Sequence, residues 1–200
     1  VVKELRELSG AGMMDCKKAL QEADGDIKKA MEVLRKNGIA KAQKKVGRSA
    51  SDGVVIPYIH PGSKLGVLLE VNCETDFVAR TEGFQDFCKD VAMHIAAASP
   101  MTVLREELSE EVVETEKNIF RDQSKKSGKP DEIIEKMIDG RMNKFYQENV
   151  LMEQSFVKNP DLSISDLLTE TIAKLGENIS IARFSRYQLG ETAPQSESTD

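Results

Sequence analysis

Around Asn72-Cys73-Glu74-Thr75-Asp76-Phe77-Val78-Ala79-Arg80, the chain changes from a strand pattern to a helix pattern. The preceding run, Leu65 to Val71, is almost entirely apolar, as expected of a buried strand. The following run, Gly83 to Ile95, repeats apolar residues at helical spacing. We therefore expect a strand-to-helix corner that holds short polar side chains and one aromatic ring between two regular elements.

Three side chains of this corner allow more than one interpretation. Thr75 and Asp76 are good helix-capping residues, because their oxygens can accept hydrogen bonds from the free N–H groups at a helix start. Phe77 can point inward and add to the core, as most aromatic side chains do. It can also point outward beside the carboxylate of Asp76, where an exposed ring could enter a pocket of a partner protein. The local pattern leaves both alternatives open.

The composition indicates a globular protein of one or two domains. The chain has 200 residues, of which 40% are hydrophobic and 5% aromatic, so we expect an aliphatic, methionine-containing core. The net charge of −6 argues against general nucleic-acid binding. Three cysteines without a CxxC pair favour a reducing compartment, and we expect the cytoplasm. The sequence also has no signal-like start and no apolar run near the ~20 residues of a membrane span.

Residues 1–40 predict a module of three short helices, similar in size and order to a ubiquitin-associated (UBA-like) module. Two glycine-containing turns separate the apolar stripes, and Asn37-Gly38 predicts the end of the third helix. Met13 and Met14 are adjacent, so one helix face cannot bury both. Partial burial in the core is the simpler interpretation of this pair. The alternative is that the adaptable methionine side chains contact a partner.

Residues 41–52 are basic and then small and polar, which predicts a linker whose start can be helical. Beyond it, residues 53–190 predict an α+β core. Two β-branched, apolar runs flank a Pro-Gly turn and predict an antiparallel hairpin. Pro57 lacks an N–H group, which places the first strand at a sheet edge or at a bulge.

The remainder of the core is mainly helical. A helix that follows Ser109 and a helix that begins at Pro130 should form a helical hairpin joined by a Ser-Gly-Lys-Pro turn. A shorter helix is predicted for Ile164 to Leu175, and a last strand for Ile179 to Leu189. The predicted fold class is α+β, with the three-helix module followed by a small antiparallel three-stranded sheet packed with helices. Residues 191–200 have no apolar pattern and predict a disordered tail.

The sequence shows no convincing catalytic, cofactor or metal site. Cys73 has no adjacent base, and the carboxylates of Glu74 and Asp76 should raise its pKa. His94 lies on an apolar helix face, where a half-buried, hydrogen-bonded histidine is expected. The acidic residues lack the spacing of a calcium loop, and there is no phosphate-binding Gly-Lys-Ser/Thr loop. We therefore expect a protein that is not an enzyme and that needs no cofactor.

Three motifs resemble, in the correct order, those of the elongation factor Ts family, the guanine-nucleotide exchange factors of elongation factor Tu in translation elongation. These motifs are Leu5 to Leu20, Asn72 to Arg80 and Leu175-Gly-Glu-Asn-Ile179. The resemblance extends from about residue 2 to about residue 190. It implies a protein that promotes GDP release by displacing the magnesium ion of its partner.

The resemblance also implies roles for individual residues. The segment expected to disturb the magnesium coordination of elongation factor Tu consists of Thr75, Asp76, Phe77 and Val78. The surface of the N-terminal module expected to contact the GTPase domain of that partner includes Leu8, Met13 and Met14. The chain resembles the compact members of the family, which implies a homodimer and a complex of two copies with two partner molecules.

Two other functional hypotheses are consistent with the residues. A UBA-type adaptor without exchange activity would bind its partner irrespective of the nucleotide, mainly through residues 1–40. An enzyme dependent on Cys73 would lose its activity when that thiol is alkylated.

Overall fold

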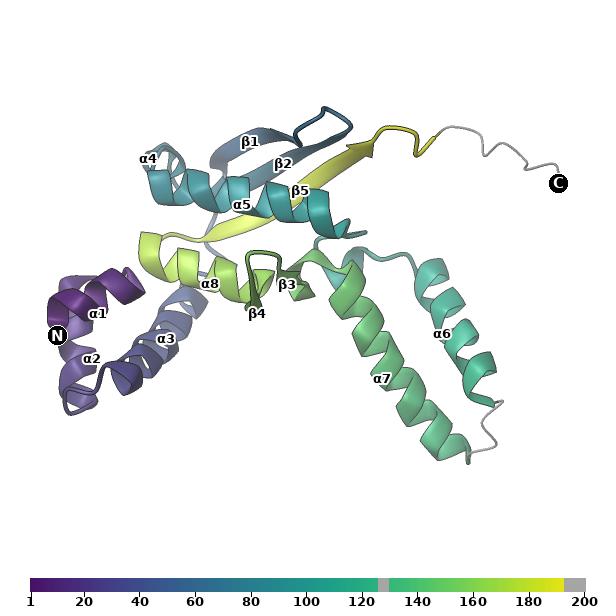
Figure 1. Ribbon diagram of the computed structural model, residues 1–200, viewed down its shortest axis with the longest axis horizontal. Coiled ribbons are helices and arrows are strands. Elements are labelled where there is room, and N and C mark those ends of the chain that lie inside the picture. The colour runs from purple at the N-terminus through teal and green to yellow at the C-terminus, as the bar shows by residue number, and fades with distance from the viewer. Residues whose placement is uncertain (126–129, 193–200) are drawn as a thin grey trace. The chain divides into compact units, whose positions relative to one another are not determined.

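The computed structural model describes residues 1–125 and 130–192 (Figure 1). This part of the chain contains helices, a small antiparallel three-stranded sheet and a two-stranded sheet, which confirms the predicted α+β class. Contacts divide the chain into two compact units. Unit 1 comprises Val1–Ile56, Glu70–Asp90 and Asp166–Ala182. Unit 2 comprises Pro57–Leu69, Val91–Ser165 and the chain from Arg183 onward.

The three-stranded sheet has the order β1-β2-β5. Its strands are β1 (Asp52–Ile59), β2 (Leu65–Cys73) and β5 (Ile179–Gln188). Pro57 therefore lies in an edge strand, as its missing N–H group predicted. At the start of β1, Gly53 has a φ of 141°, and a Cβ atom there would lie 2.2 Å from the carbonyl oxygen of Val71. Only glycine fits at this close approach of two backbones.

Unit 1 begins with the three predicted helices, α1 (Val2–Ser9), α2 (Met13–Glu22) and α3 (Ile27–Gln43). Asp26 caps α3, because its carboxylate accepts a hydrogen bond of 3.1 Å from the N–H of Lys29. The helices enclose a small aliphatic core made of Leu5, Cys16, Ala19, Leu20, Ala23 and Ala30.

The predicted end of the third helix at Asn37-Gly38 is wrong, because α3 continues to Gln43. A Cβ atom on Gly38 would lie 3.4 Å from the Cβ atom of Ala173 in α8 (Ile164–Leu175). Gly38 therefore allows α3 and α8 to approach closely, and this packing outweighs the roughly 1 kcal/mol that glycine costs inside a helix. The first residues of the predicted linker are consequently helical, as expected for its start.

Two further helices follow β2. The first, α4 (Asp76–Ala79), is a single turn, and the second, α5 (Glu82–Ala98), contributes buried aromatic side chains. In unit 1, α8 ends at Leu175, and the next residue, Gly176, has a φ of 78° and donates its N–H to the carbonyl oxygen of Ile172 at 2.8 Å. The chain then passes through Glu177 and Asn178 into β5.

Unit 2 contains the predicted helical hairpin, made of α6 (Glu110–Lys125) and α7 (Asp131–Asn149), which lie side by side in Figure 1. Its small core consists of Ile134, Ile138 and Met142 with partly buried neighbours. Ser109 caps α6 as predicted, since its hydroxyl accepts a hydrogen bond of 3.3 Å from the N–H of Val112. Residues 126–129 and 193–200, which hold most of the predicted turn and tail, lie outside the described residues.

Unit 2 also contains short elements that the sequence did not predict. They are the 3-10 turns η1 (Arg105–Glu107) and η2 (Leu151–Glu153) and an antiparallel pair of strands, β3 (Ser155–Phe156) and β4 (Asn159–Ser163). His94 of α5 is fully buried beside them, and its Nε2 lies 2.9 Å from Oε1 of Gln154. Across residues 1–125 and 130–192, no helix combines the length and apolarity needed to cross a membrane.

Candidate partner-binding site

The corner after β2 exposes one aromatic ring. Phe77 is 80% exposed on α4, so of the two alternatives for this side chain the outward one is correct. Thr75 caps the helical turn, because its hydroxyl oxygen accepts a hydrogen bond of 3.4 Å from the N–H of Val78. Asp76 forms an exposed ion pair of 2.7 Å with Arg80, one turn later. The four predicted residues, Thr75 to Val78, thus form one continuous surface segment.

Glu177 holds this corner from a distant part of the sequence. Its Oε2 accepts hydrogen bonds from the N–H groups of Glu74, at 3.1 Å, and Thr75, at 3.0 Å. Its Oε1 accepts a hydrogen bond of 2.7 Å from the hydroxyl of Thr75. One carboxylate therefore satisfies three donors of the corner, across 102 residues of sequence in the case of Thr75.

A second set of contacts runs in the opposite direction. Glu74 Oε1 accepts a hydrogen bond of 2.7 Å from the N–H of Asn178. The side-chain amide of Asn178 donates to the carbonyl oxygen of Arg48 at 2.7 Å, and the guanidinium of Arg48 lies 3.8 Å from Glu74. The Leu175–Ile179 motif and the corner are thus joined reciprocally. Both motifs are visible in the sequence, but no local pattern indicates that Glu177 and Asn178 contact the corner.

The three residues predicted on the N-terminal module are all exposed. Leu8 at the end of α1 is 63% exposed, and Met13 and Met14 at the start of α2 are 59% and 65% exposed. The simpler interpretation of the methionine pair, partial burial in the core, is therefore wrong. The α1–α2 turn leaves α2 to bury Cys16, Ala19 and Leu20 instead.

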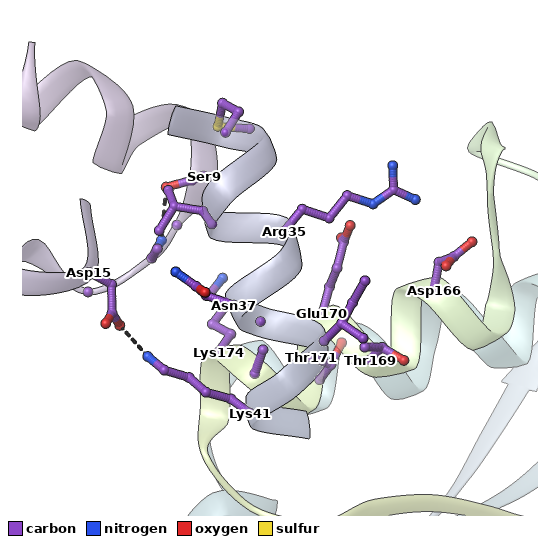
Figure 2. A pocket seen from close by; sticks show the side chains of 18 of the residues that line it. Ser9, Asp15, Arg35, Asn37, Lys41, Asp166, Thr169, Glu170, Thr171 and Lys174 are labelled. Carbon is purple, nitrogen blue, oxygen red and sulfur yellow. Dashed lines mark hydrogen bonds and ion pairs between the residues drawn. The ribbon is translucent and has the colours of Figure 1, made fainter. Parts of the chain in front are cut away.

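A groove of about 730 Å³ lies within unit 1 between the α1–α2 turn, α3 and α8 (Figure 2). Leu8 is part of its wall, whereas Met13 and Met14 are not. At one end of the groove Lys41 pairs with Asp15 at 2.7 Å, as the dashed line in Figure 2 marks. Helical periodicity located α3 and α8 but could not show that their faces meet; the glycine at position 38 was the one available signal.

The corner contains no activated nucleophile. Cys73 is buried, and its thiol donates to the carbonyl oxygen of Thr75 at 3.2 Å. Burial, and then the negative charge of Glu177, raise the pKa of Cys73, in the predicted direction but not through the two carboxylates that the sequence suggested. Burial raises the pKa of Cys88 to about 12. No group of three or more His, Cys, Asp or Glu residues that could hold a metal ion occurs in the described ranges.

Comparison with known proteins identifies the family. The family described as "Elongation factor TS" matches residues 2–191. The chain is 59% identical over 197 residues to "Elongation factor Ts" of Geotalea daltonii, covering 98% of this chain and 91% of the relative. It is 58% identical over 191 residues to the protein of the same name from Carboxydothermus hydrogenoformans, covering 96% and 88%.

The protein named "Elongation factor Ts" of Fervidobacterium nodosum is 56% identical over 191 residues, covering 96% of this chain and 97% of the relative. The match therefore includes all three motifs and extends through both units. With a family match over residues 2–191 and relatives of which it covers 88% to 97%, the chain belongs to the elongation factor Ts family.

Proposed function

We propose that this chain is a guanine-nucleotide exchange factor that releases GDP from elongation factor Tu by inserting the Phe77 corner next to the nucleotide site. Membership in the elongation factor Ts family over residues 2–191 supports the exchange role. The single observation that carries the mechanism is the 80% exposure of Phe77 on a capped, clamped turn. The adaptor hypothesis concerned mainly residues 1–40 and gives no reason for this exposed ring.

The proposed mechanism is displacement of magnesium from the partner. In a GTPase, magnesium bridges phosphate oxygens and protein ligands, so its loss uncovers phosphate charge and weakens the hold on the diphosphate. A thousandfold acceleration requires a barrier lower by about 4 kcal/mol, at about 1.4 kcal/mol per factor of ten. An aromatic anchor that becomes buried, together with lost metal coordination, is of this scale. By linkage, the chain must then bind nucleotide-free partner more tightly than GDP-bound partner.

The neighbours of Phe77 suit this mechanism. The side chain of Asp76 is 45% exposed and that of Arg80 is 80% exposed, so their ion pair can open at little cost and free a carboxylate for the partner. Thr75 is held by Glu177 and caps the turn by accepting a hydrogen bond from the N–H of the half-buried Val78. We assign the second contact to the N-terminal module, whose exposed apolar residues include Leu8, Met13 and Met14.

No chemical step is assigned to the chain itself, so we propose that it acts as a binding catalyst of exchange and not as an enzyme in the strict sense. The buried thiol of Cys73 is no candidate nucleophile. We also propose a cytoplasmic location, where translation elongation takes place. For the domains we propose the predicted division into a helical module (1–40), a linker (41–52), an α+β core (53–190) and a tail (191–200).

We further propose that the chain forms a homodimer, which gives a 2:2 complex with the partner. One sheet face in unit 2 supports this proposal, since Leu68 is 50% exposed between the buried Val67 and Leu69. Ile59, Tyr187 and Leu189 are 60%, 73% and 75% exposed. A second copy of the same apolar face is a suitable cover for it.

The experiment that tests the exchange mechanism is stopped-flow release of fluorescent GDP from elongation factor Tu. The wild-type chain should accelerate release, and Phe77→Ala should reduce that acceleration about tenfold or more, the loss of one aromatic anchor. Leu104→Ala serves as the control, because it removes an apolar side chain that is 46% exposed in unit 2. Equal rates for wild type and Phe77→Ala would remove Phe77 from the mechanism.

The dimer is tested separately by light scattering of the free chain. Leu68→Asp should shift the mass toward the monomer, whereas Leu104→Asp should not. A wild-type chain that is monomeric at micromolar concentration would refute the homodimer and leave the exchange function untouched.

A further inference from the structure

We propose that Glu177 is a positioning residue for nucleotide exchange, which orders the Thr75 cap and thereby holds Phe77 in the direction that the partner requires. This inference rests on the proposed exchange function and deepens it. It adds a residue from a different motif, 100 residues further along the chain than Phe77.

The hydroxyl of Thr75 has two tasks that only one arrangement satisfies well. A hydroxyl group has one hydrogen to donate and two lone pairs to accept with. Its hydrogen is directed to Oε1 of Glu177, at 2.7 Å, which leaves the lone pairs for the N–H of Val78, at 3.4 Å. The carboxylate of Glu177 therefore orients the cap of α4 as well as fixing its position.

The turn that carries Phe77 cannot order itself. It has four residues, far fewer than an isolated helix needs for stability in water. The ring of Phe77 is 80% exposed and can contribute little packing of its own. Without external support, the partner would have to order the corner on binding, which reduces the gain from the contact.

Glu177 is well placed to give that support, because its own backbone is fixed from both sides. It follows Gly176, the left-handed end of α8, and precedes Ile179, which is buried at the start of β5. The reciprocal bond from the N–H of Asn178 to Glu74 ties the same two segments a second time. The corner is thus braced by the end of a helix and the start of a strand.

The test measures exchange by four chains, namely wild type, Glu177→Ala, Phe77→Ala and the double variant. Glu177→Ala should lower the acceleration at saturating factor about tenfold, equivalent to about 1.4 kcal/mol, with a smaller change in the half-saturating concentration. The double variant should be no slower than Phe77→Ala alone, because Glu177 acts through Phe77. A purely structural role would give losses that multiply.

Three measurements complete the test. Glu177→Gln keeps the size and one acceptor oxygen, so it should fold and retain an intermediate rate. Glu82→Ala removes a neighbouring exposed carboxylate of α5 and should leave the rate unchanged. Amide hydrogen exchange of the free chain should be faster at Thr75 and Val78 in Glu177→Ala and unchanged in the core of α5.

The outcomes separate the two proposals. If wild type is active and both Glu177→Ala and Glu177→Gln are as active as wild type, the positioning role is wrong and the exchange function stands. Multiplicative losses in the double variant would also overturn it. A wild-type chain without exchange activity would overturn the proposed function and this inference together.

Discussion

Two polar networks, one in each unit, connect distant parts of the sequence, but one supports an exposed corner and the other lies in the interior. In unit 1, Glu177 binds the Thr75 corner across 102 residues and supports a ring that is 80% exposed. In unit 2, His94 contacts Gln154 across 60 residues, and both side chains are almost completely buried. The first network therefore orders the surface that we propose as the partner contact, whereas the second joins internal elements.

The two networks differ in how far solvent reaches their polar groups. A fully buried network contributes mainly to the stability of its unit, because its groups lose water on folding and must find partners inside. Altering a half-buried network beside an exposed ring should cost less stability, because water can reach the groups left without a partner, but it should change how the ring is presented. Substitutions in the two networks should accordingly affect different measurements.

The largest expected effect is on stability, from His94→Ala. This change leaves a cavity and removes the hydrogen-bond partner of Gln154 and of the N–H of Val157, so the free energy of unfolding should fall by about 3 kcal/mol. Urea denaturation measures it, with exposed His60→Ala as the control. Exchange by the remaining folded protein should stay within about twofold of wild type. A large exchange defect in that folded protein would contradict the assignment of the His94 network to stability alone.

The next effect, about tenfold, is the loss of exchange in Phe77→Ala. Its free energy of unfolding should stay within about 0.5 kcal/mol of wild type, because an exposed ring contributes little to the core. Denaturation and GDP release are measured on the same preparation. A stability loss as large as that of His94→Ala would show that the ring packs inside the fold.

A smaller effect concerns pH. Burial lowers the pKa of His94, so below the ordinary histidine value of 6.5 the unfolded chain binds more protons than the folded one. The free energy of unfolding is therefore not reduced by His94 above pH 6.5. It falls as the pH drops below 6.5, by at most about 1.4 kcal/mol per pH unit. Urea denaturation between pH 7.5 and 5 should show this loss in wild type and His60→Gln and a weaker one in His94→Gln. Identical pH profiles for all three would contradict a neutral, buried His94.

The smallest effect is predicted for Cys73→Ser, within the corner itself. The serine hydroxyl can replace the thiol that donates to the carbonyl oxygen of Thr75, so the exchange rate should change by less than about twofold. The same stopped-flow assay measures it. Loss of activity in this variant would revive the hypothesis of a Cys73-dependent enzyme.

Much of the fold was predictable because its signals are local. The helical stripes, the Pro-Gly hairpin, the Ser109 cap and the edge position of Pro57 depend on neighbouring residues, and the structure confirms them. The end assigned to the third helix was wrong for the opposite reason. Gly38 serves a contact with Ala173, which lies far away in the sequence.

The candidate site was predictable only in part. The motif located Thr75 to Val78, but the exposure of Phe77 depends on a turn held by Glu177, and no local pattern encodes that contact. The predicted partial burial of Met14 was wrong, because helical spacing does not show which residues of the first turn of a helix remain exposed. The pair of strands β3 and β4 escaped notice because β3 has only two residues.

The most direct test of the account is the magnesium dependence of GDP release from elongation factor Tu in the presence of this chain. If the Phe77 corner displaces the ion, excess magnesium should progressively suppress the acceleration, and Phe77→Ala should be slow at every magnesium concentration. The account would be contradicted if the acceleration were the same at low and high magnesium and if wild type and Phe77→Ala accelerated release equally.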